Sequence, residues 1–371
     1  MADSLQDFYR DRRVFVTGHT GFKGSWLCHW LLGMGARVTG YALSPPTDPS
    51  LFEQLQLRER LAHHEADVRD RVRLRDALVA ARPDTVFHLA AQSLVQESYR
   101  QPVETFDINV MGTVHVMAAL AALQSPVVGV MVTSDKCYEN VGVGRRFPED
   151  APLGGRDPYS ASKAAAEIAI RSFRVSVLDR MPSDTRPRVA SARAGNVIGG
   201  GDYSDNRIVP DAIRALSSGE PIPVRNPLHV RPWQHVLEPL GGYLTLAQAL
   251  HDGRLADAEP GDASARAWNF GPTADSTVKV ETLVNAVLQH WPGSWANVGH
   301  PAPHEAGTLS LAIDKAASEL GWKPAWNLQE TVRATVDWYH EVHQCAAADV
   351  PTVARRLCSE QIARYIATPQ R

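Results

Sequence analysis

The sequence has few cysteines, no excess of charge of either sign and no long apolar run. Its four cysteines, Cys28, Cys137, Cys345 and Cys358, lack the spacing of a disulfide framework or a zinc site, so we expect reduced thiols, no bound metal and a cytoplasmic protein. Lys and Arg number 38 against 41 Asp and Glu, a net charge of -3, which does not favour binding to nucleic acid or a membrane surface.

The chain also lacks the features of an exported or membrane protein. Its N-terminus has no apolar signal region. No stretch approaches the roughly 20 consecutive apolar residues that span a membrane. We therefore expect no membrane partner.

The first half of the chain alternates strand and helix patterns. Short apolar strands are expected at 14–16, 37–41, 85–89 and 127–131, and helices at 26–34, 72–79 and 103–123. This alternation predicts the α/β class, with a doubly wound parallel sheet of the Rossmann type covered by helices on both faces.

After about residue 200 the pattern becomes less regular, because Pro and Trp are frequent and the strands are short. We expect residues 1–200 to form mainly a dinucleotide-binding domain. Residues 201–371 are expected to form mainly a smaller, mixed α/β substrate-binding lobe, with some segments returning to the first domain. Apolar residues at 353, 357, 362 and 365 predict an amphipathic C-terminal helix.

A glycine-rich turn lies between the first strand and the first helix. The candidate cofactor-binding residues of this turn are Gly18, Thr20, Gly21, Phe22, Lys23 and Gly24. Glycines at a strand-to-helix turn let the backbone approach a pyrophosphate, whose charge is favoured by the helix N-terminus. The spacing Gly-x-x-Gly-x-x-Gly is that of the short-chain dehydrogenases.

Other strand ends supply further candidates for the cofactor site. The second strand ends without an acidic residue for the adenosine ribose and offers only Ser44, but it also lacks an arginine for a 2′-phosphate, so NAD is favoured over NADP. Asp67 and Val68 could hold the adenine edge. Leu89, Ala90, Ala91 and Gln92 end a strand where the cofactor should lie.

Two further motifs have the composition of a catalytic site. Tyr159 and Lys163 lie four residues apart and so share one face of a helix, where the ammonium can lower the pKa of the phenol and make it a base. Ser134, Asp135 and Lys136 follow the apolar strand at 127–131 and bring a hydroxyl, a carboxyl and an amine to one strand end.

Several stretches resemble one enzyme family over nearly the whole chain, to about residue 339. They include TGHTGFKGSWL (17–27), TSDKCYEN (133–140), PLGGRDPYSASKAAAE (152–167), ARAGNVIGGGD (192–202) and RPWQHVLEPLGGYL (231–244). The chain resembles the nucleotide-sugar 4,6-dehydratases of the extended short-chain dehydrogenase/reductase family, and within them those that act on CDP-glucose. The resemblance implies conversion of CDP-glucose to CDP-4-keto-6-deoxyglucose with NAD as cofactor.

The resemblance also implies roles for the candidate catalytic residues. Tyr159 would be the base for hydride removal at C4, assisted by Ser134, and Lys163 would bind the nicotinamide ribose. Asp135 would protonate the departing 6-hydroxyl. Lys136 stands where the relatives that act on deoxythymidine-diphosphate-glucose carry glutamate, and is the candidate base for the C5 proton; alternatively it only positions the sugar or pairs with Asp135.

By the same resemblance, the substrate-binding candidates are Gln92, Asn196, Arg207, Arg231, His235 and Glu305. For Arg193 two interpretations remain open, a contact to the substrate pyrophosphate or a structural salt bridge. The helices near 103–123 and 159–175 resemble the pair that forms the dimer interface in this family, so a homodimer is expected.

Three functions remain open from the sequence. The first is dehydration of CDP-glucose, and the second is dehydration or 4-epimerisation of another nucleotide sugar. An epimerase needs no acid and base for C6 and C5, so Asp135 and Lys136 disfavour it. The third is an NAD-sensing module without catalysis, which the presence of Tyr159 and Lys163 disfavours.

Overall fold

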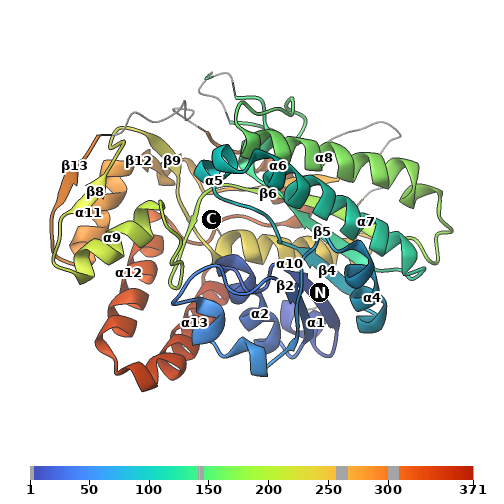
Figure 1. Cartoon of the computed structure of the whole chain (residues 1–371), viewed down its shortest axis with the longest axis horizontal. Helices are drawn as coiled ribbons and strands as arrows, with labels where there is room; N and C mark the ends of the chain where they lie inside the picture. The colour runs from blue at the N-terminus through green and yellow to red at the C-terminus, as the bar shows by residue number, and fades with distance from the viewer. Residues whose placement is uncertain (1–3, 141, 143–145, 256–265, 300–308, 371) are drawn as a thin grey trace.

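A seven-stranded sheet forms the centre of the computed structural model, which describes residues 4–140, 142, 146–255, 266–299 and 309–370 (Figure 1). The strand order is β11-β6-β5-β4-β1-β2-β3, and every neighbouring pair is parallel. The strands are β1 (Arg13–Thr17), β2 (Arg37–Ala42), β3 (Ala62–Glu65), β4 (Thr85–His88), β5 (Val128–Val132), β6 (Arg188–Ala194) and β11 (Ala267–Phe270). The expected doubly wound, Rossmann-type sheet is confirmed.

Helices cover both faces of this sheet. On one face lie α2 (Phe22–Gly33) and α10 (Leu237–His251), and on the other lie α4 (Arg71–Ala81), α7 (Gly112–Ala122) and α8 (Pro158–Ser176). Because side chains alternate along a strand, Val14 and Val16 pack with the first set of helices, whereas Phe15 packs with the second. The sheet is therefore buried on both sides, as parallel sheets require.

Shorter elements complete the first half of the chain. They are α1 (Leu5–Tyr9), α3 (Leu51–Gln54), α5 (Val95–Arg100) and α6 (Pro102–Phe106), the π-helical turn η2 (Asp107–Met111), and the 3₁₀ helices η1 (Leu57–Glu59), η3 (Asp135–Cys137) and η4 (Leu178–Arg180). The turn η2 joins α6 to α7, so residues 102–122 form one continuous helical stretch, as expected for 103–123.

This stretch, Pro102–Ala122, qualifies one expectation from the sequence. By length and composition it could cross a membrane, and it is the one such segment among the residues described. Buried core helices of globular proteins meet the same criterion, and part of this helix packs against α4 and α8. The apolar character of the stretch is therefore weak support for a membrane span.

The second half of the chain adds a smaller lobe beside the carboxyl ends of the strands. Its elements are α9 (Ile208–Ser217), α11 (Val280–His290), α12 (Leu328–Gln344), α13 (Val350–Ala367), the 3₁₀ helices η5 (Ala274–Ser276) and η7 (Ala347–Asp349), and the π-helical turn η6 (Ala316–Leu320). Three two-stranded ribbons pair β7 (Val197–Ile198) with β10 (Gln234–His235), β9 (Val230–Pro232) with β12 (Thr277–Lys279), and β8 (Ile222–Val224) with β13 (Trp295–Asn297).

Three segments of the second half pack with the first. Strand β11 extends the central sheet, α10 covers one of its faces, and α13 packs against α2 and α3. Helix α12, which precedes α13, begins at a capping box in which Asn327 and Glu330 each accept a hydrogen bond from the other's backbone N–H. The C-terminal helix expected from residues 353–365 is confirmed, and it docks on its own chain.

Candidate active site

At two positions of the glycine turn after β1 only glycine fits, because neighbouring backbone atoms leave no room for a Cβ. Gly18 has a φ of +74°, and a Cβ there would lie 2.6 Å from the backbone nitrogen of Ala90. A Cβ on Gly24 would lie 2.2 Å from the carbonyl oxygen of Gly18. The turn therefore brings the start of α2 against the ends of β1 and β4, which is where a dinucleotide binds in this type of fold.

The N-terminus of α2 keeps its backbone donors available. Gly21 is the N-cap residue and has no side chain to bond the first-turn N–H groups of Phe22 and Lys23. The hydroxyl of Thr20 donates instead to the carbonyl of Leu43 at 2.9 Å, which ties the turn to the end of β2. N–H groups without a side-chain cap at the start of a twelve-residue helix fit a pyrophosphate.

Asp67, a candidate contact for the adenosine end of the cofactor, already has a hydrogen-bond partner. Arg69 donates to its carboxylate at 2.6 Å, and this hydrogen bond lowers the pKa of Asp67. Val68 is buried against Gly112, where a Cβ would meet its Cγ2 at 2.9 Å. Ser44 is exposed just beyond β2. The contact of Asp67 with adenine stays a prediction.

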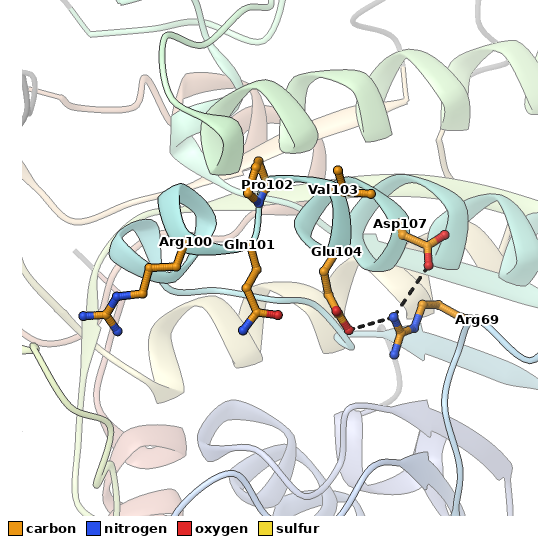
Figure 2. A pocket seen from close by; sticks show the side chains of 7 residues that line it. All are labelled: Arg69, Arg100, Gln101, Pro102, Val103, Glu104 and Asp107. Carbon is orange, nitrogen blue, oxygen red and sulfur yellow. Dashed lines mark hydrogen bonds and ion pairs between the residues drawn. The ribbon is translucent and has the colours of Figure 1, made fainter.

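Arg69 also borders a surface hollow of about 380 Å³ (Figure 2). In Figure 2 its guanidinium lies between Glu104, at 2.7 Å, and Asp107, at 3.6 Å. The other lining residues are Arg100, Gln101, Pro102 and Val103. None of them is a catalytic candidate, so we do not place the reaction in this hollow.

The loop after β4 is held by hydrogen bonds. Leu89, Ala90 and Ala91 are half-buried next to the glycine turn. The side chain of Gln92 donates to the hydroxyl of Thr105 at 2.9 Å and accepts from the backbone of Leu94. The amide of Gln92 is thus bonded within the protein, and its substrate contact stays a prediction.

Tyr159 and Lys163 lie in the first turns of α8, as expected. Asp157 caps this helix by accepting from the backbone N–H of Ser160 at 2.9 Å, and Pro158 occupies its first position. Burial raises the pKa of Tyr159 to about 12, against the effect of a hydrogen bond with Ser134. Burial lowers the pKa of Lys163 to about 8.

Ser134, Asp135 and Lys136 begin the turn that follows β5. The hydroxyl of Ser134 donates to Asp135 at 3.0 Å and accepts from the backbone N–H of Lys136 at 3.2 Å. Burial raises the pKa of Asp135 even though the positive charges of Lys136, Lys23 and Arg231 oppose this shift. A carboxyl with a raised pKa can hold a proton and act as a general acid.

Cationic side chains surround this centre. The ammonium of Lys23 lies 3.4 Å from the hydroxyl of Tyr243, and burial, followed by the charge of Arg207, lowers its pKa to about 8. Arg207 itself is held by the carboxylate of Asp202 at 3.0 Å. Arg231 is buried and donates to the carbonyl of Val230 at 2.9 Å. The arrangement suits a substrate that carries two phosphate charges.

Asn196 follows Gly195, which lies against Asp135. A Cβ at Gly195 would come within 2.7 Å of a carboxylate oxygen of Asp135, so the backbone before Asn196 passes directly beside the acid. Asn196 is half-buried. This position is compatible with a substrate contact, which stays a prediction.

His235, a substrate-binding candidate, and Arg193, for which two interpretations were open, both lie in the core. His235 is fully buried, and its ring packs on Trp326 at 4.8 Å and on Trp26 at 5.9 Å, so it is a core residue whose pKa burial lowers to about 3. Arg193 is also buried and forms a bidentate ion pair with Glu167 at 2.9–3.0 Å. This geometry favours the structural salt bridge. Glu305 lies outside the described residues.

Sequence reasoning missed three residues beside the centre. Tyr243 contacts Lys23 from α10, Asp202 orients Arg207, and Glu167 pairs with Arg193. Glu167 follows Lys163 by four residues in a helix, so the spacing that joined Tyr159 to Lys163 could have identified it. Nothing local to the sequence marks Tyr243, because α10 approaches the site only through the folded chain.

Comparison with known proteins gives matches along most of the chain. A family model described as GDP-mannose 4,6 dehydratase matches residues 15–335. A CDP-glucose 4,6-dehydratase of Salmonella typhimurium is 44% identical over 339 residues, which cover 90% of this chain and 92% of that protein. A dTDP-glucose 4,6-dehydratase of Streptomyces griseus is 29% identical over 337 residues, covering 88% and 94%.

Solved structures match the fold. The crystal structure of a dTDP-glucose 4,6-dehydratase from Bacillus anthracis, in complex with NAD, has a TM-score of 0.72 at 20% identity and covers 88% of this chain and 96% of that one. A putative epimerase from Burkholderia cenocepacia gives a TM-score of 0.72 at 25% identity, covering 90% and 99%. The fold is thus shared by proteins with different names.

Proposed function

Because the chain belongs to the family described as GDP-mannose 4,6 dehydratase, we propose that it is an NAD-dependent lyase that converts CDP-glucose to CDP-4-keto-6-deoxyglucose. The choice of nucleotide follows the 44% identity with a CDP-glucose 4,6-dehydratase over 90% of the chain. The reaction type follows from one observation above all. A buried carboxyl with a raised pKa, Asp135, shares Ser134 with the tyrosine of a Tyr-x-x-x-Lys pair.

The glycine turn supports NAD as the cofactor. The close approach at Gly18 and the uncapped start of α2 fit a pyrophosphate, and Lys163 would hold the nicotinamide ribose. When bound, NAD supplies the acceptor and the later donor of a hydride. No arginine stands at the end of β2 for a 2′-phosphate, so we expect NADP to bind more weakly.

The side chains of the centre move the protons. Tyr159 accepts the proton of the 4-hydroxyl as C4 is oxidised, and its phenolate is favoured by the hydrogen bond with Ser134, although burial opposes it. Lys136 removes the C5 proton, and Asp135 protonates the 6-hydroxyl, which leaves as water. Lys136 then returns its proton to C5 as a hydride reaches C6.

Ser134 closes the proton balance. After elimination, Tyr159 carries one extra proton and Asp135 lacks one. The hydroxyl of Ser134 donates to Asp135 at 3.0 Å and lowers the pKa of Tyr159, so it is placed to pass the proton from the phenol to the carboxylate. The protonation states of Tyr159 and Asp135 are thereby restored by transfer within the site.

The cations beside this centre are proposed to bind the substrate. Arg207 and Arg231 would hold the pyrophosphate, while Asn196, Gln92 and Glu305 would contact the nucleotide sugar. In this proposal residues 1–200 mainly bind the cofactor and residues 201–371 mainly bind the substrate. The elements α10, β11 and α13 of the second half return to the first domain.

We also propose a cytoplasmic homodimer without a membrane partner. Exposed apolar side chains lie on the helices that resemble the family's dimer interface, with Val103, Phe106 and Met111 in the stretch 102–122 and Ile168 and Val175 on α8. A second copy of the chain would cover them. The apolar stretch 102–122 is then explained by burial against protein rather than lipid.

The test is to incubate purified protein and NAD with CDP-, UDP-, dTDP- and GDP-linked glucose and to follow 4-keto-6-deoxy products by mass spectrometry. We expect product from CDP-glucose. An unchanged CDP-glucose beside a dehydrated competitor would reassign the nucleotide, and a 4-epimer without loss of water would reassign the reaction. A parallel titration of NAD and NADP into cofactor-free protein tests the cofactor.

A further inference from the structure

A buried ion pair lies directly behind the proposed catalytic turn. Glu167 of α8 and Arg193 of β6 have side chains only 4% and 3% exposed, and two hydrogen bonds of 2.9 and 3.0 Å join them. Two of their remaining hydrogen bonds are to Thr133 and Tyr138, the residues on either side of the segment that contains Ser134, Asp135 and Lys136.

Glu167 holds the start of this segment. The hydroxyl of Thr133, the residue before Ser134, donates to one carboxylate oxygen of Glu167. The hydroxyl of Ser191, on β6, donates to the other oxygen at 2.8 Å. The carboxylate therefore accepts four hydrogen bonds. Burial would raise the pKa of Glu167, but Arg193 and these bonds outweigh that effect and lower it.

Arg193 holds the end of the same segment. Its Nη1 donates to the hydroxyl of Tyr138 at 2.7 Å and to the carbonyl of Glu149 at 2.9 Å. The Tyr138 hydroxyl in turn donates to Asn269, on β11, at 2.7 Å, and its ring stacks on Phe147. Tyr138 is therefore fixed to two strands of the sheet.

We propose that the Glu167–Arg193 pair is a positioning device that sets the placement of Ser134, Asp135 and Lys136 by holding Thr133 and Tyr138 on either side of them. A buried ion pair is weak support for stability, since an apolar replacement of similar volume is often neutral or stabilising. A role in placing residues 134–136 explains why Glu167 and Arg193 form hydrogen bonds to the residues on either side of them. The inference rests on the proposed function and adds four residues to its machinery: Thr133, Tyr138, Glu167 and Arg193.

The test removes the flanking contacts while leaving the ion pair intact. Thr133→Val keeps the shape of the side chain and loses one hydroxyl, and Tyr138→Phe loses another. Ser191→Ala is the matched control, because it removes a hydrogen bond from the same carboxylate of Glu167 but does not touch the turn.

We expect each single variant to lower kcat about tenfold and the double variant about a hundredfold, with KM and NAD affinity within about threefold of wild type, since small misplacement of reacting groups has costs of this size. Ser191→Ala should stay within twofold in kcat. Slower elimination should also increase the fraction of the double variant that holds reduced cofactor during turnover, which is measured by absorbance at 340 nm. A double variant with the kcat of the control would overturn the proposal.

Amide hydrogen exchange provides a readout that does not depend on the substrate. In the double variant, exchange in residues 133–139 should become at least tenfold faster than in wild type, while the control keeps the wild-type rate. Equal exchange in the double variant and the control would refute the placement role, even if no nucleotide sugar proved to be a substrate. Inactivity of the wild-type protein on every sugar, beside the expected exchange, would refute only the proposed function.

Discussion

Among single residues, the neighbours Asp135 and Lys136 have opposite proposed roles, one as an acid and the other as a base. Burial keeps Asp135 able to hold a proton, so it suits the acid that releases water from C6. The C5 proton then needs a separate acceptor beside it, and Lys136 follows directly in the chain. Lys136 is half-buried, whereas Asp135 is almost fully buried.

We expect Lys136→Ala to retain oxidation at C4 and to lose elimination. The proposed base is removed, while Tyr159, Ser134 and Lys163 remain, so overall turnover should fall by about 10²–10⁴-fold. The variant should accumulate absorbance at 340 nm and a 4-ketose, and in heavy water C5 should take up little deuterium. Mass spectrometry of the sugar measures the last point.

Lys136→Glu is the matched control for this experiment. It restores a proton acceptor of the kind found at this position in the relatives that use deoxythymidine-diphosphate-glucose, so part of the C5 exchange should return. Wild-type deuterium uptake and turnover in Lys136→Ala would instead leave Lys136 with a role only in positioning.

At the scale of elements, the turn between β1 and α2 can be tested by adding single methyl groups. Gly18→Ala would place a Cβ 2.6 Å from the backbone of Ala90 in a left-handed conformation, so we expect at least tenfold weaker NAD binding and a loss of about 1–3 kcal/mol in stability. Calorimetric titration with NAD and urea unfolding measure the two effects.

Gly33→Ala, at the other end of α2, is the control. Among the described residues, no atom beyond the adjoining helix backbone lies within 4 Å of its added Cβ, and the helical backbone suits alanine, so stability should rise by about 0.4–1 kcal/mol with NAD affinity unchanged. If Gly18→Ala bound NAD as tightly as Gly33→Ala, the turn would not be the pyrophosphate site.

The elements also show how far sequence patterns reach. The spacing of apolar residues and the glycine-rich turn predicted the strand–glycine–helix unit and helix α8, because these features depend on residues close together in the chain. The resemblance names His235 as a substrate contact, whereas β10 buries its ring against Trp326. This packing depends on contacts between distant segments of the chain, which the spacing of residues does not reveal.

At the scale of the whole molecule, buried histidines couple stability to pH. His88 lies at the end of β4 between the hydroxyls of Thr17 and Thr113, and burial lowers its pKa to about 3. In the unfolded chain a histidine titrates near a pKa of about 6.5. Between these values the unfolded state binds the extra proton, so this contribution to stability is lost as the pH falls below about 6.5.

We expect His88→Gln to flatten the pH dependence of unfolding between pH 4 and 6. The unfolding free energy of the variant should change by about 1.4 kcal/mol less per pH unit than that of wild type, since one proton fewer is taken up. Urea unfolding at several pH values measures the slope. The matched change His64→Gln, on the edge strand β3, is the control, and equal slopes for the two variants would refute the assignment.

The last prediction concerns assembly. Met111 and Ile168 are 43% and 58% exposed on the two helical stretches proposed to meet a second copy. A charge there would be buried without a partner in a dimer, which is strongly unfavourable, so Met111→Glu and Ile168→Glu should each weaken dimerisation at least a hundredfold. Leu228→Glu, at an equally apolar and exposed position in the other lobe, should leave the dimer intact. Light scattering after gel filtration distinguishes these outcomes, and a monomeric wild-type protein would disprove the proposed assembly.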